Sequence, residues 1–183
     1  MFSYPSTRGI RMSIGCLDVH YNDPRAAVAC VVLPSWQASQ PAECVVTAVH
    51  GVMPYESGAF YRRELPCIEA ALKTLRLIPE ILVIDGYVWL GKGKKGLGAH
   101  LYEARGMLGA VVGIAKTAFS GAEPAAEVLR GQSRRPLFVS AVGMELAEAC
   151  AHVREMHGEF RIPWAMSEVD RLARTHKLPI TKS

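Results

Sequence analysis

The chain has 183 residues and a mass of 20.0 kDa, which is the size of one domain, and we expect a single domain over residues 1–183. Half of the residues are hydrophobic, but no uninterrupted apolar stretch approaches the roughly 20 residues that a membrane helix needs, so the sequence predicts a soluble protein with no membrane partner. A net charge of +4 and a pI near 8.9 allow a polyanionic partner without requiring one.

The first half of the chain predicts three strands followed by a helix. The strands are expected at Arg11–Tyr21, Ala26–Leu33 and Glu43–His50, separated by an Asn22-Asp23-Pro24 turn and a loop over Pro34–Pro41. Three successive strands joined by short turns favour an antiparallel meander. After an irregular segment over 51–61, apolar spacing predicts a helix over Arg62–Leu77, in which Pro66 is tolerated because it falls in the first turn.

A continuous apolar run, Ile81–Asp85, begins the second half and ends in a carboxylate before Gly86. Such a run is typical of a strand covered on both faces, and the carboxyl ends of these strands usually carry the chemistry of α/β sheets. An Asp at this place can equally cap a turn. The elements expected next are a Gly91–Gly96 loop, a helix over Leu97–Leu108, a strand over Ala110–Ala115, a hairpin over Glu127–Ala141, and helices over Met144–His157 and Trp164–Thr175.

This order of elements predicts an α/β fold with a ribonuclease H-like mixed sheet flanked by helices. Three antiparallel strands are followed by parallel strands, which crossover helices join with right-handed connections. In that arrangement the first strand lies beside the strand that follows the first helix. We therefore expect Asp18 and Asp85 to meet near the centre of the sheet.

The amino terminus and the cysteines indicate the compartment. The first nine residues have no basic region followed by an apolar core, so they do not resemble a secretory signal, and the cytoplasm is the expected location. The five cysteines lie mostly in apolar runs and include no C-x-x-C pair. We expect buried, reduced thiols rather than disulfides or a zinc site.

The acidic residues indicate a metal-dependent reaction. The chain contains only four aspartates, Asp18, Asp23, Asp85 and Asp170, and this topology can bring three of them together with Glu64. Adjacent carboxylates repel and raise each other's pKa, so such a cluster calls for a cation. Mg²⁺ or Mn²⁺ prefers oxygen ligands and can polarise a phosphodiester, activate water and neutralise the leaving oxygen. The sequence therefore predicts phosphodiester hydrolysis.

Six short blocks in order, from about residue 11 to 174, resemble the endonuclease V family of inosine-directed nucleases with a ribonuclease H-like fold. The acids within them are separated by 46 (64 − 18) and 21 (85 − 64) residues. Arg161-Ile162-Pro163 followed by Asp170 looks like the family's last block. The six blocks are Leu17-Asp18-Val19-His20-Tyr21, Pro54-Tyr55 with Gly58, Phe60-Tyr61-Arg62-Arg63-Glu64-Leu65-Pro66, Val83-Ile84-Asp85-Gly86, Gly96-Leu97-Gly98-Ala99-His100 and Gly113-Ile114-Ala115-Lys116.

The resemblance implies roles for five residues in catalysis. Asp18 and Asp85 would ligate the metal, and Glu64 would complete the acidic site. Lys116 would hold a backbone phosphate or stabilise developing charge, and Asp170 would be a further acid near the metal. From the residues alone, Lys116 can also be an ordinary exposed strand end, and Asp170 can simply support its helix by pairing with the arginine four residues later.

The resemblance also implies a place for the extruded base. Tyr55 corresponds to the family's wedge tyrosine, whose ring props the duplex open while the lesion base leaves the stack. The alternative is a packed loop aromatic. Gly58, Phe60, Gly86 and Leu97 match the pocket that takes the base, where glycine allows close backbone approach.

Several blocks depart from the family pattern. Glu56-Ser57 follow the wedge tyrosine where the family has Ile-Pro, and Tyr87 to Gly91 replace a segment that usually carries histidines. Trp164 to Ser167 replace the family's Pro-Thr-Arg block. These departures leave two alternatives open: a nucleic-acid-binding protein that does not cleave, and a nuclease with changed base specificity.

Lys92, Lys94 and Lys95 follow the strand that ends in Asp85 by 7 to 10 residues (92 − 85 and 95 − 85), so we expect them on the rim of the acidic site. There they would contact phosphates of DNA or RNA, on a loop that glycines keep pliable. As an isolated cluster they can also be a solvated face, as can Arg134-Arg135. The sequence does not choose between DNA and RNA, and we expect a monomer.

Overall fold

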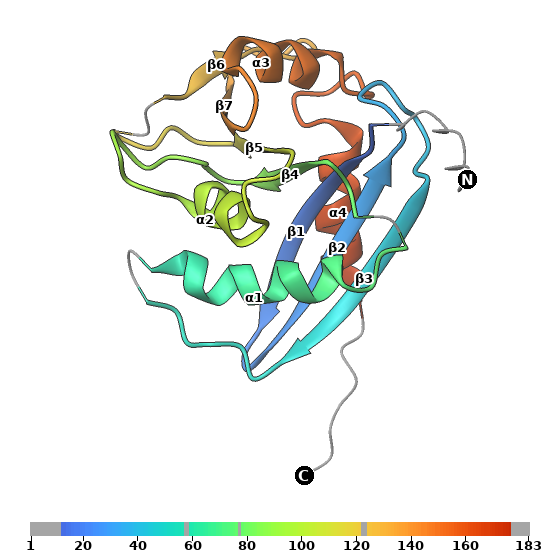
Figure 1. Cartoon of the computed structure of the whole chain (residues 1–183). Helices are drawn as coiled ribbons and strands as arrows, with labels where there is room; N and C mark the ends of the chain where they lie inside the picture. The colour runs from blue at the N-terminus through green and yellow to red at the C-terminus, as the bar shows by residue number, and fades with distance from the viewer. Residues whose placement is uncertain (1–11, 57–58, 77, 122–123, 177–183) are drawn as a thin grey trace, which may run out of the picture.

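A mixed sheet of seven strands with four helices packed against it forms the described part of the chain, which comprises residues 12–56, 59–76, 78–121 and 124–176 of a computed structural model (Figure 1). The strands are β1 (Ile14–Asn22), β2 (Arg25–Leu33), β3 (Glu43–His50), β4 (Ile81–Asp85), β5 (Ala110–Ala115), β6 (Ala126–Val128) and β7 (Leu137–Val142). The helices are α1 (Phe60–Leu72), α2 (Leu97–Ala104), α3 (Leu146–Glu155) and α4 (Trp164–Thr175).

The strand order is β3-β2-β1-β4-β5-β7-β6, which confirms the predicted fold class. The strands β1, β2 and β3 form an antiparallel meander, and β1, β4 and β5 are parallel neighbours. The predicted hairpin supplies β6 and β7, which extend the sheet antiparallel to β5. Leu17 of β1 is level with Ile84 of β4, so the residues that follow them, Asp18 and Asp85, end up side by side.

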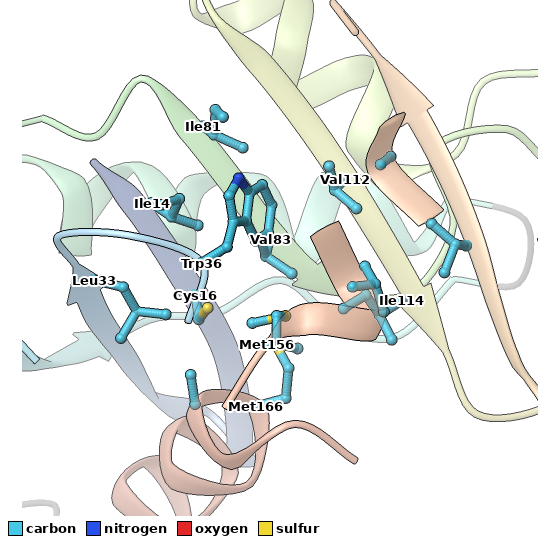
Figure 2. Packing of buried hydrophobic residues seen from close by; sticks show 14 of the residues in the cluster. Ile14, Cys16, Leu33, Trp36, Ile81, Val83, Val112, Ile114, Met156 and Met166 are labelled. Carbon is cyan, nitrogen blue, oxygen red and sulfur yellow. The ribbon is translucent and has the colours of Figure 1, made fainter. Parts of the chain in front are cut away.

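Helices cover both faces of the sheet, which explains the continuous apolar strands. In Figure 1, α1 and α2 lie on one face and α4 on the other. Alternate residues of β2 point to opposite faces: Val28 belongs to the core under α1 and α2, and Ala29 to the core under α3 and α4. In the second core, Trp36 lies among Ile14 and Val83 (Figure 2). Each fully buried aliphatic side chain contributes about 1.5–3 kcal/mol to folding.

Two helices differ from the predicted ones. Helix α1 begins at Phe60 and ends at Leu72, so Pro66 lies in its second turn, not the first, and the predicted reason for its tolerance is wrong. Its neighbours Cys67 and Ile68 are 1% exposed, and this burial offsets the lost backbone hydrogen bond. Helix α2 stops at Ala104 rather than residue 108, because the backbone then turns left-handed at positions 106 and 107, with φ of 71° and 60°.

The cysteines were expected to be buried, reduced thiols, and this holds for four of the five. All five cysteines are free thiols, and four are buried, whereas Cys44 is exposed on β3. Cys44 lies on the outermost strand of the sheet, which only one neighbouring strand covers. Within the described residues, no helix has both the length and the apolar character needed to cross a membrane.

Candidate active site

The carboxyl ends of β4 and β5 lie next to the middle of β1 and bring three charged residues together. Asp18 follows the Leu17–Ile84 register pair, and Asp85 is the last residue of β4. Asp85 is level with Ile114 of β5, and Lys116 comes two residues later. Parallel strands end at the same edge of a sheet, so this arrangement follows from the sheet itself.

Lys116 is paired with Asp85 through a short hydrogen bond from its Nζ to Oδ2 of the carboxylate. Partial burial disfavours the ammonium, but the hydrogen bond and charge of Asp85, with smaller contributions from Asp18 and Asp170, raise the pKa of Lys116 above its ordinary value. The lysine therefore carries its positive charge throughout the physiological range. It is not a free strand end, because it neutralises one carboxylate of the cluster.

Glu64 faces the same cluster from α1. It is 7% exposed, and its Oε2 is buried without a hydrogen-bond partner in the described residues. Burial, together with the charges of Asp18 and Asp85 and opposed by Arg63, raises the pKa of Glu64 to about 8. A carboxyl in this state is protonated at neutral pH unless a cation approaches.

Asp18 is the second carboxyl with a strongly raised pKa. Burial, with the charges of Asp85 and of the neighbouring Asp170 on α4, raises the pKa of Asp18 to about 6. The Val19 backbone N–H, which donates to Oδ1 at 2.9 Å, acts in the opposite direction. Asp18 thus has acidic neighbours on both sides, from β4 and from α4.

Asp170 forms the expected pair along its helix and also interacts with the acidic cluster. Arg174 donates from Nε to its Oδ1 at 2.7 Å, which is the expected pair along the helix. Partial burial raises its pKa, but Arg174, a hydrogen bond with Asp18 and the charge of Lys116 outweigh this and lower the pKa of Asp170 overall. The aspartate therefore supports its helix and also lies against the acidic cluster.

The donor set suits a hard cation, although its ligands are not preassembled. The side chains of Asp18, Glu64 and Asp85 offer carboxylate oxygens, and one oxygen of Glu64 lacks any partner. In the part of the chain that the structure describes, no three His, Cys, Asp or Glu side chains stand together as a ready metal-binding group. Lys116 occupies Asp85 instead, so a cation has to replace that ammonium.

A cavity of about 450 Å³ opens beside the acids, between the start of α1, the β4–α2 loop and the segment after β5. This volume is in the range of small-ligand pockets. Glu64 and Asp85 line it on one side. Six residues expected to bind substrate also line it: Tyr55, Phe60, Gly86, Lys94, Lys95 and Leu97. Gly58, the remaining expected pocket residue, lies outside the described residues.

The aromatic residues of the cavity are unequally exposed. Tyr55 is 66% exposed, and its ring centroid lies 6.1 Å from that of Phe60. Phe60 in turn packs edge-on against Tyr21 at 6.2 Å. Tyr55 is therefore not a packed loop aromatic: it projects from the mouth of the cavity, supported by a ring behind it.

Other lining residues were missed from the sequence, among them Tyr87 and Phe119. The Tyr87 hydroxyl donates to the Thr117 carbonyl at 2.8 Å and accepts from the Phe119 backbone N–H at 3.1 Å. Tyr87 thus fastens the segment after Lys116 to the loop after Asp85. Tyr87 was noticed only as a departure from the family pattern, and no local signal points to Phe119.

The three loop lysines are separated in the structure. Lys94 and Lys95 line the cavity, whereas Lys92 lines a different one with Trp89. Lys95 is held by Glu103 at 2.6 Å. The expected pliable loop is instead a tight turn, because the Leu90 N–H donates to the Lys94 carbonyl at 2.8 Å and the position-96 N–H donates to the Val88 carbonyl at 2.8 Å.

Comparison with known proteins identifies the family of the chain. The family model described as endonuclease V matches residues 5–171. Endonuclease V of Streptomyces avermitilis is 35% identical over 182 residues, which cover 86% of this chain and 77% of that protein. The chain belongs to the endonuclease V family. Endonuclease V of Streptomyces coelicolor is 32% identical over 182 residues, which cover 86% of this chain and 76% of that protein. Endonucleases V are hydrolases of the nuclease class and depend on a divalent metal ion.

Solved endonuclease V structures share the fold. That from Streptomyces avermitilis has a TM-score of 0.72 at 26% identity, with 88% of this chain and 79% of that chain covered. Human endonuclease V has a TM-score of 0.72 at 26% identity, with coverages of 89% and 83%. Endonuclease V of Ciona intestinalis, in complex with a 23mer DNA containing an inosine followed by a ribo-adenosine, has a TM-score of 0.76 at 21% identity, with coverages of 89% and 84%.

Proposed function

We propose that this protein is a divalent-metal-dependent endonuclease that hydrolyses phosphodiester bonds in DNA or RNA next to inosine or another deaminated base. One observation carries the proposal: an acidic cluster formed by Asp18, Glu64 and Asp85 lies beside a cavity that has an exposed tyrosine at its mouth. Membership of the endonuclease V family supports the reaction class.

Asp18 and Asp85 are the proposed metal ligands, with Glu64 and Asp170 as supporting acids. Mg²⁺ or Mn²⁺ is the proposed ion, because the donors are carboxylate oxygens and because repulsion among them costs free energy until a cation is bound. When bound, such an ion polarises the phosphodiester and activates water. The partnerless oxygen of Glu64 supports this assignment, since a buried carboxylate oxygen without a partner is otherwise costly.

The other side chains would bind and orient the nucleic acid. Lys116, once released from Asp85, would hold a backbone phosphate or stabilise developing charge. Tyr55, which is 66% exposed, would take the place of a base that leaves the stack. Phe60 and Leu97 would line the pocket for that base, and at Gly86, with φ of 144°, nothing lies within 4 Å of where a Cβ would stand, so the backbone is open to close approach. Gly58 enters through the family resemblance alone.

Inosine is the first base to test, because the Ciona intestinalis protein was solved with inosine-containing DNA. Flipping a mispaired base from a duplex costs a few kcal/mol, less than flipping a paired one, which favours deaminated bases as substrates. The carboxyl groups and the cavity do not discriminate DNA from RNA. Both polymers therefore belong in the same assay.

The deciding experiment incubates the purified full chain with end-labelled single- and double-stranded DNA and RNA, with and without one inosine. Each substrate is tested with Mg²⁺, with Mn²⁺ and with EDTA. We expect cleavage near inosine that needs the metal and that is lost in Asp85→Asn and strongly reduced in Glu64→Gln. The matched control is Glu148→Gln, the same change at a glutamate on α3 whose side chain is 56% exposed.

Two results would overturn the proposal. One is the absence of product with every metal, and the other is undiminished cleavage by the Asp85→Asn protein. Retained binding in EDTA together with no product would assign the chain instead to nucleic-acid binding without cleavage. Metal-dependent cleavage that ignores inosine would keep the endonuclease and replace the base specificity.

A further inference from the structure

A second surface lies at the same edge of the sheet as the acidic cluster. The β6–β7 turn, residues 129–136, enters β7 where Phe138 is level with Ala115, the residue before Lys116. Arg161, in the α3–α4 loop of residues 156–163, donates from Nη2 to the Pro136 carbonyl at 2.6 Å and also to the Lys116 carbonyl. One guanidinium nitrogen therefore holds the turn against the backbone of Lys116.

A groove of about 800 Å³ separates the β6–β7 turn from the α3–α4 loop. Its lining residues are Gly131, Gln132, Ser133, Glu159, Phe160 and Arg161. At one point the two walls touch, because a Cβ at position 131 would lie 2.0 Å from the Glu159 carbonyl oxygen, an approach that only glycine permits.

Hydrogen bonds from a buried arginine fix the backbone of the α3–α4 loop, which forms one wall of the groove. Arg130 is 5% exposed and donates to the Phe160 carbonyl at 2.9 Å and the position-158 carbonyl at 3.0 Å, as well as to the carbonyls of Met156 and Arg161. Across the groove, the Ser133 hydroxyl accepts from the Arg135 backbone N–H at 3.1 Å. Both walls are therefore shaped before any ligand arrives.

Exposed groups in this groove and on the turn beside it suit a nucleic-acid strand. Arg134 and Arg135 do not line the groove but follow its lining residue Ser133 on the β6–β7 turn, where both are exposed and form no ion pair within the described residues. Arg130 and Arg161, in contrast, are engaged by carbonyl groups. Phe160 is 73% exposed although its backbone is pinned. Proteins bind single strands by combining basic side chains, which contact phosphates, with accessible aromatic rings, on which bases stack.

We propose that this groove binds the strand that continues from the scissile phosphate, with Arg134 and Arg135 on its phosphates and Phe160 stacked on a base. The proposal rests on the proposed function, since the strand reaches the groove by way of Lys116. It also answers an electrostatic need: the carboxylates at the site repel a polyanion, and two unpaired arginines on the adjoining turn offset that repulsion.

The test measures binding of fluorescently labelled single-stranded, inosine-containing oligonucleotides by anisotropy over a series of salt concentrations, with Ca²⁺ as the cation. The variants are Arg134→Ala/Arg135→Ala and Phe160→Leu, which keeps an apolar side chain but removes the ring. The control for charge is Lys73→Ala/Arg76→Ala, which removes two exposed basic residues from the α1–β4 connection at the opposite edge of the sheet.

The double arginine variant is expected to reduce the slope of log K against log salt by about 0.7 per lost contact, about 1.4 in all. Phe160→Leu is expected to raise Kd by roughly 5- to 150-fold with little change in slope. The Lys73→Ala/Arg76→Ala control should change neither quantity. The Lys73→Ala/Arg76→Ala control should also leave the rate of cleavage of bound substrate unchanged, because neither side chain belongs to the acidic cluster or to the groove.

Binding and slope equal to those of the control in both groove variants would overturn the proposal. Wild-type cleavage, measured on the same preparations, separates this failure from failure of the proposed function. If the wild-type protein cleaves and the groove variants bind normally, only the proposal about the groove is wrong. If the wild-type protein never cleaves but the arginine variant has a reduced salt slope, the groove binds nucleic acid and the proposed endonuclease activity is wrong.

Discussion

Replacing Glu64 by glutamine is expected to change how the stability of the metal-free protein depends on pH. The side chain is 7% exposed, and burial together with the charges of Asp18 and Asp85 raises its pKa from 4.5 to about 8. In the unfolded chain the pKa of the same carboxyl returns to its ordinary value of 4.5. At pH values between about 4.5 and about 8, the folded protein therefore holds a proton that the unfolded chain releases.

The sign of the effect follows from this difference. Because Glu64 in the folded state holds a proton between about pH 4.5 and pH 8, its contribution to the free energy of unfolding is greatest below about pH 4.5 and falls as the pH rises through this window. A pKa difference of about 3.5 (8 − 4.5) corresponds to about 5 kcal/mol at 1.36 kcal/mol per pH unit. This is an upper bound, because the charges of Asp18 and Asp85 supply part of the shift, and Asp18 itself has a raised pKa.

Urea unfolding in EDTA at several pH values between about 5 and about 8 measures the effect. The wild-type protein and Glu148→Gln, the exposed control, are expected to lose several kcal/mol of stability over this range. Glu64→Gln is expected to lose much less, because the amide has no proton to release, so it should be the more stable protein near pH 8. Equal pH dependence in Glu64→Gln and the wild type would refute the reasoning and place the titration on other groups.

Three further perturbations test neighbouring parts of the site. Mg²⁺ is expected to raise the melting temperature of the wild type with concentration, as ligand linkage requires, and not that of Asp85→Asn; an equal rise in both would remove Asp85 from the ligand set. Tyr87→Phe removes two hydrogen bonds, so we expect the free energy of unfolding, measured with urea, to fall by about 1–2 kcal/mol. The Phe119 amide should also exchange its hydrogen faster, and unchanged exchange would mean that Tyr87 does not hold that segment in place. Lys94→Ala is expected to lower the salt slope on duplex DNA by about 0.9, whereas Lys92→Ala should not, and equal effects would contradict their placement on different cavities.

The sheet was predictable because each of its strands carries a local signal. The apolar run that ends in Asp85 is buried on both faces, as its composition indicated. The positions of Asp18 and Asp85 then follow from topology, since neighbouring parallel strands end at one edge. The start of α1 was misplaced by two residues and Pro66 was put in the wrong turn, because packing against the sheet decides where that helix begins, and packing is not a local property.

The loops around the site were not predictable in the same way. Tyr87 reaches Thr117 across 30 residues of sequence, and Arg161 reaches Lys116 across 45. Contacts of this kind leave no periodicity and no spacing in the sequence. Phe119 and Phe160 are exposed apolar residues in loops, and from sequence nothing distinguishes them from chance surface residues.

The ion pair between Asp85 and Lys116 would connect cation binding to substrate binding. In the structure, repulsion among the carboxylates is relieved in two ways: burial keeps a proton on Glu64, whose pKa is about 8, and the ammonium of Lys116 pairs with Asp85. Both arrangements compete with a divalent cation, which requires ionised carboxylates and releases protons as it binds. Glu64 and Asp18 would then give up protons, and Lys116 would lose its carboxylate partner beside a surface that already carries Arg134 and Arg135. A lysine displaced in this way needs a new anion, and a backbone phosphate is the anion that the proposed reaction brings. In the proposed mechanism, the exchange that prepares the acids for a cation would therefore also free Lys116 to bind the substrate.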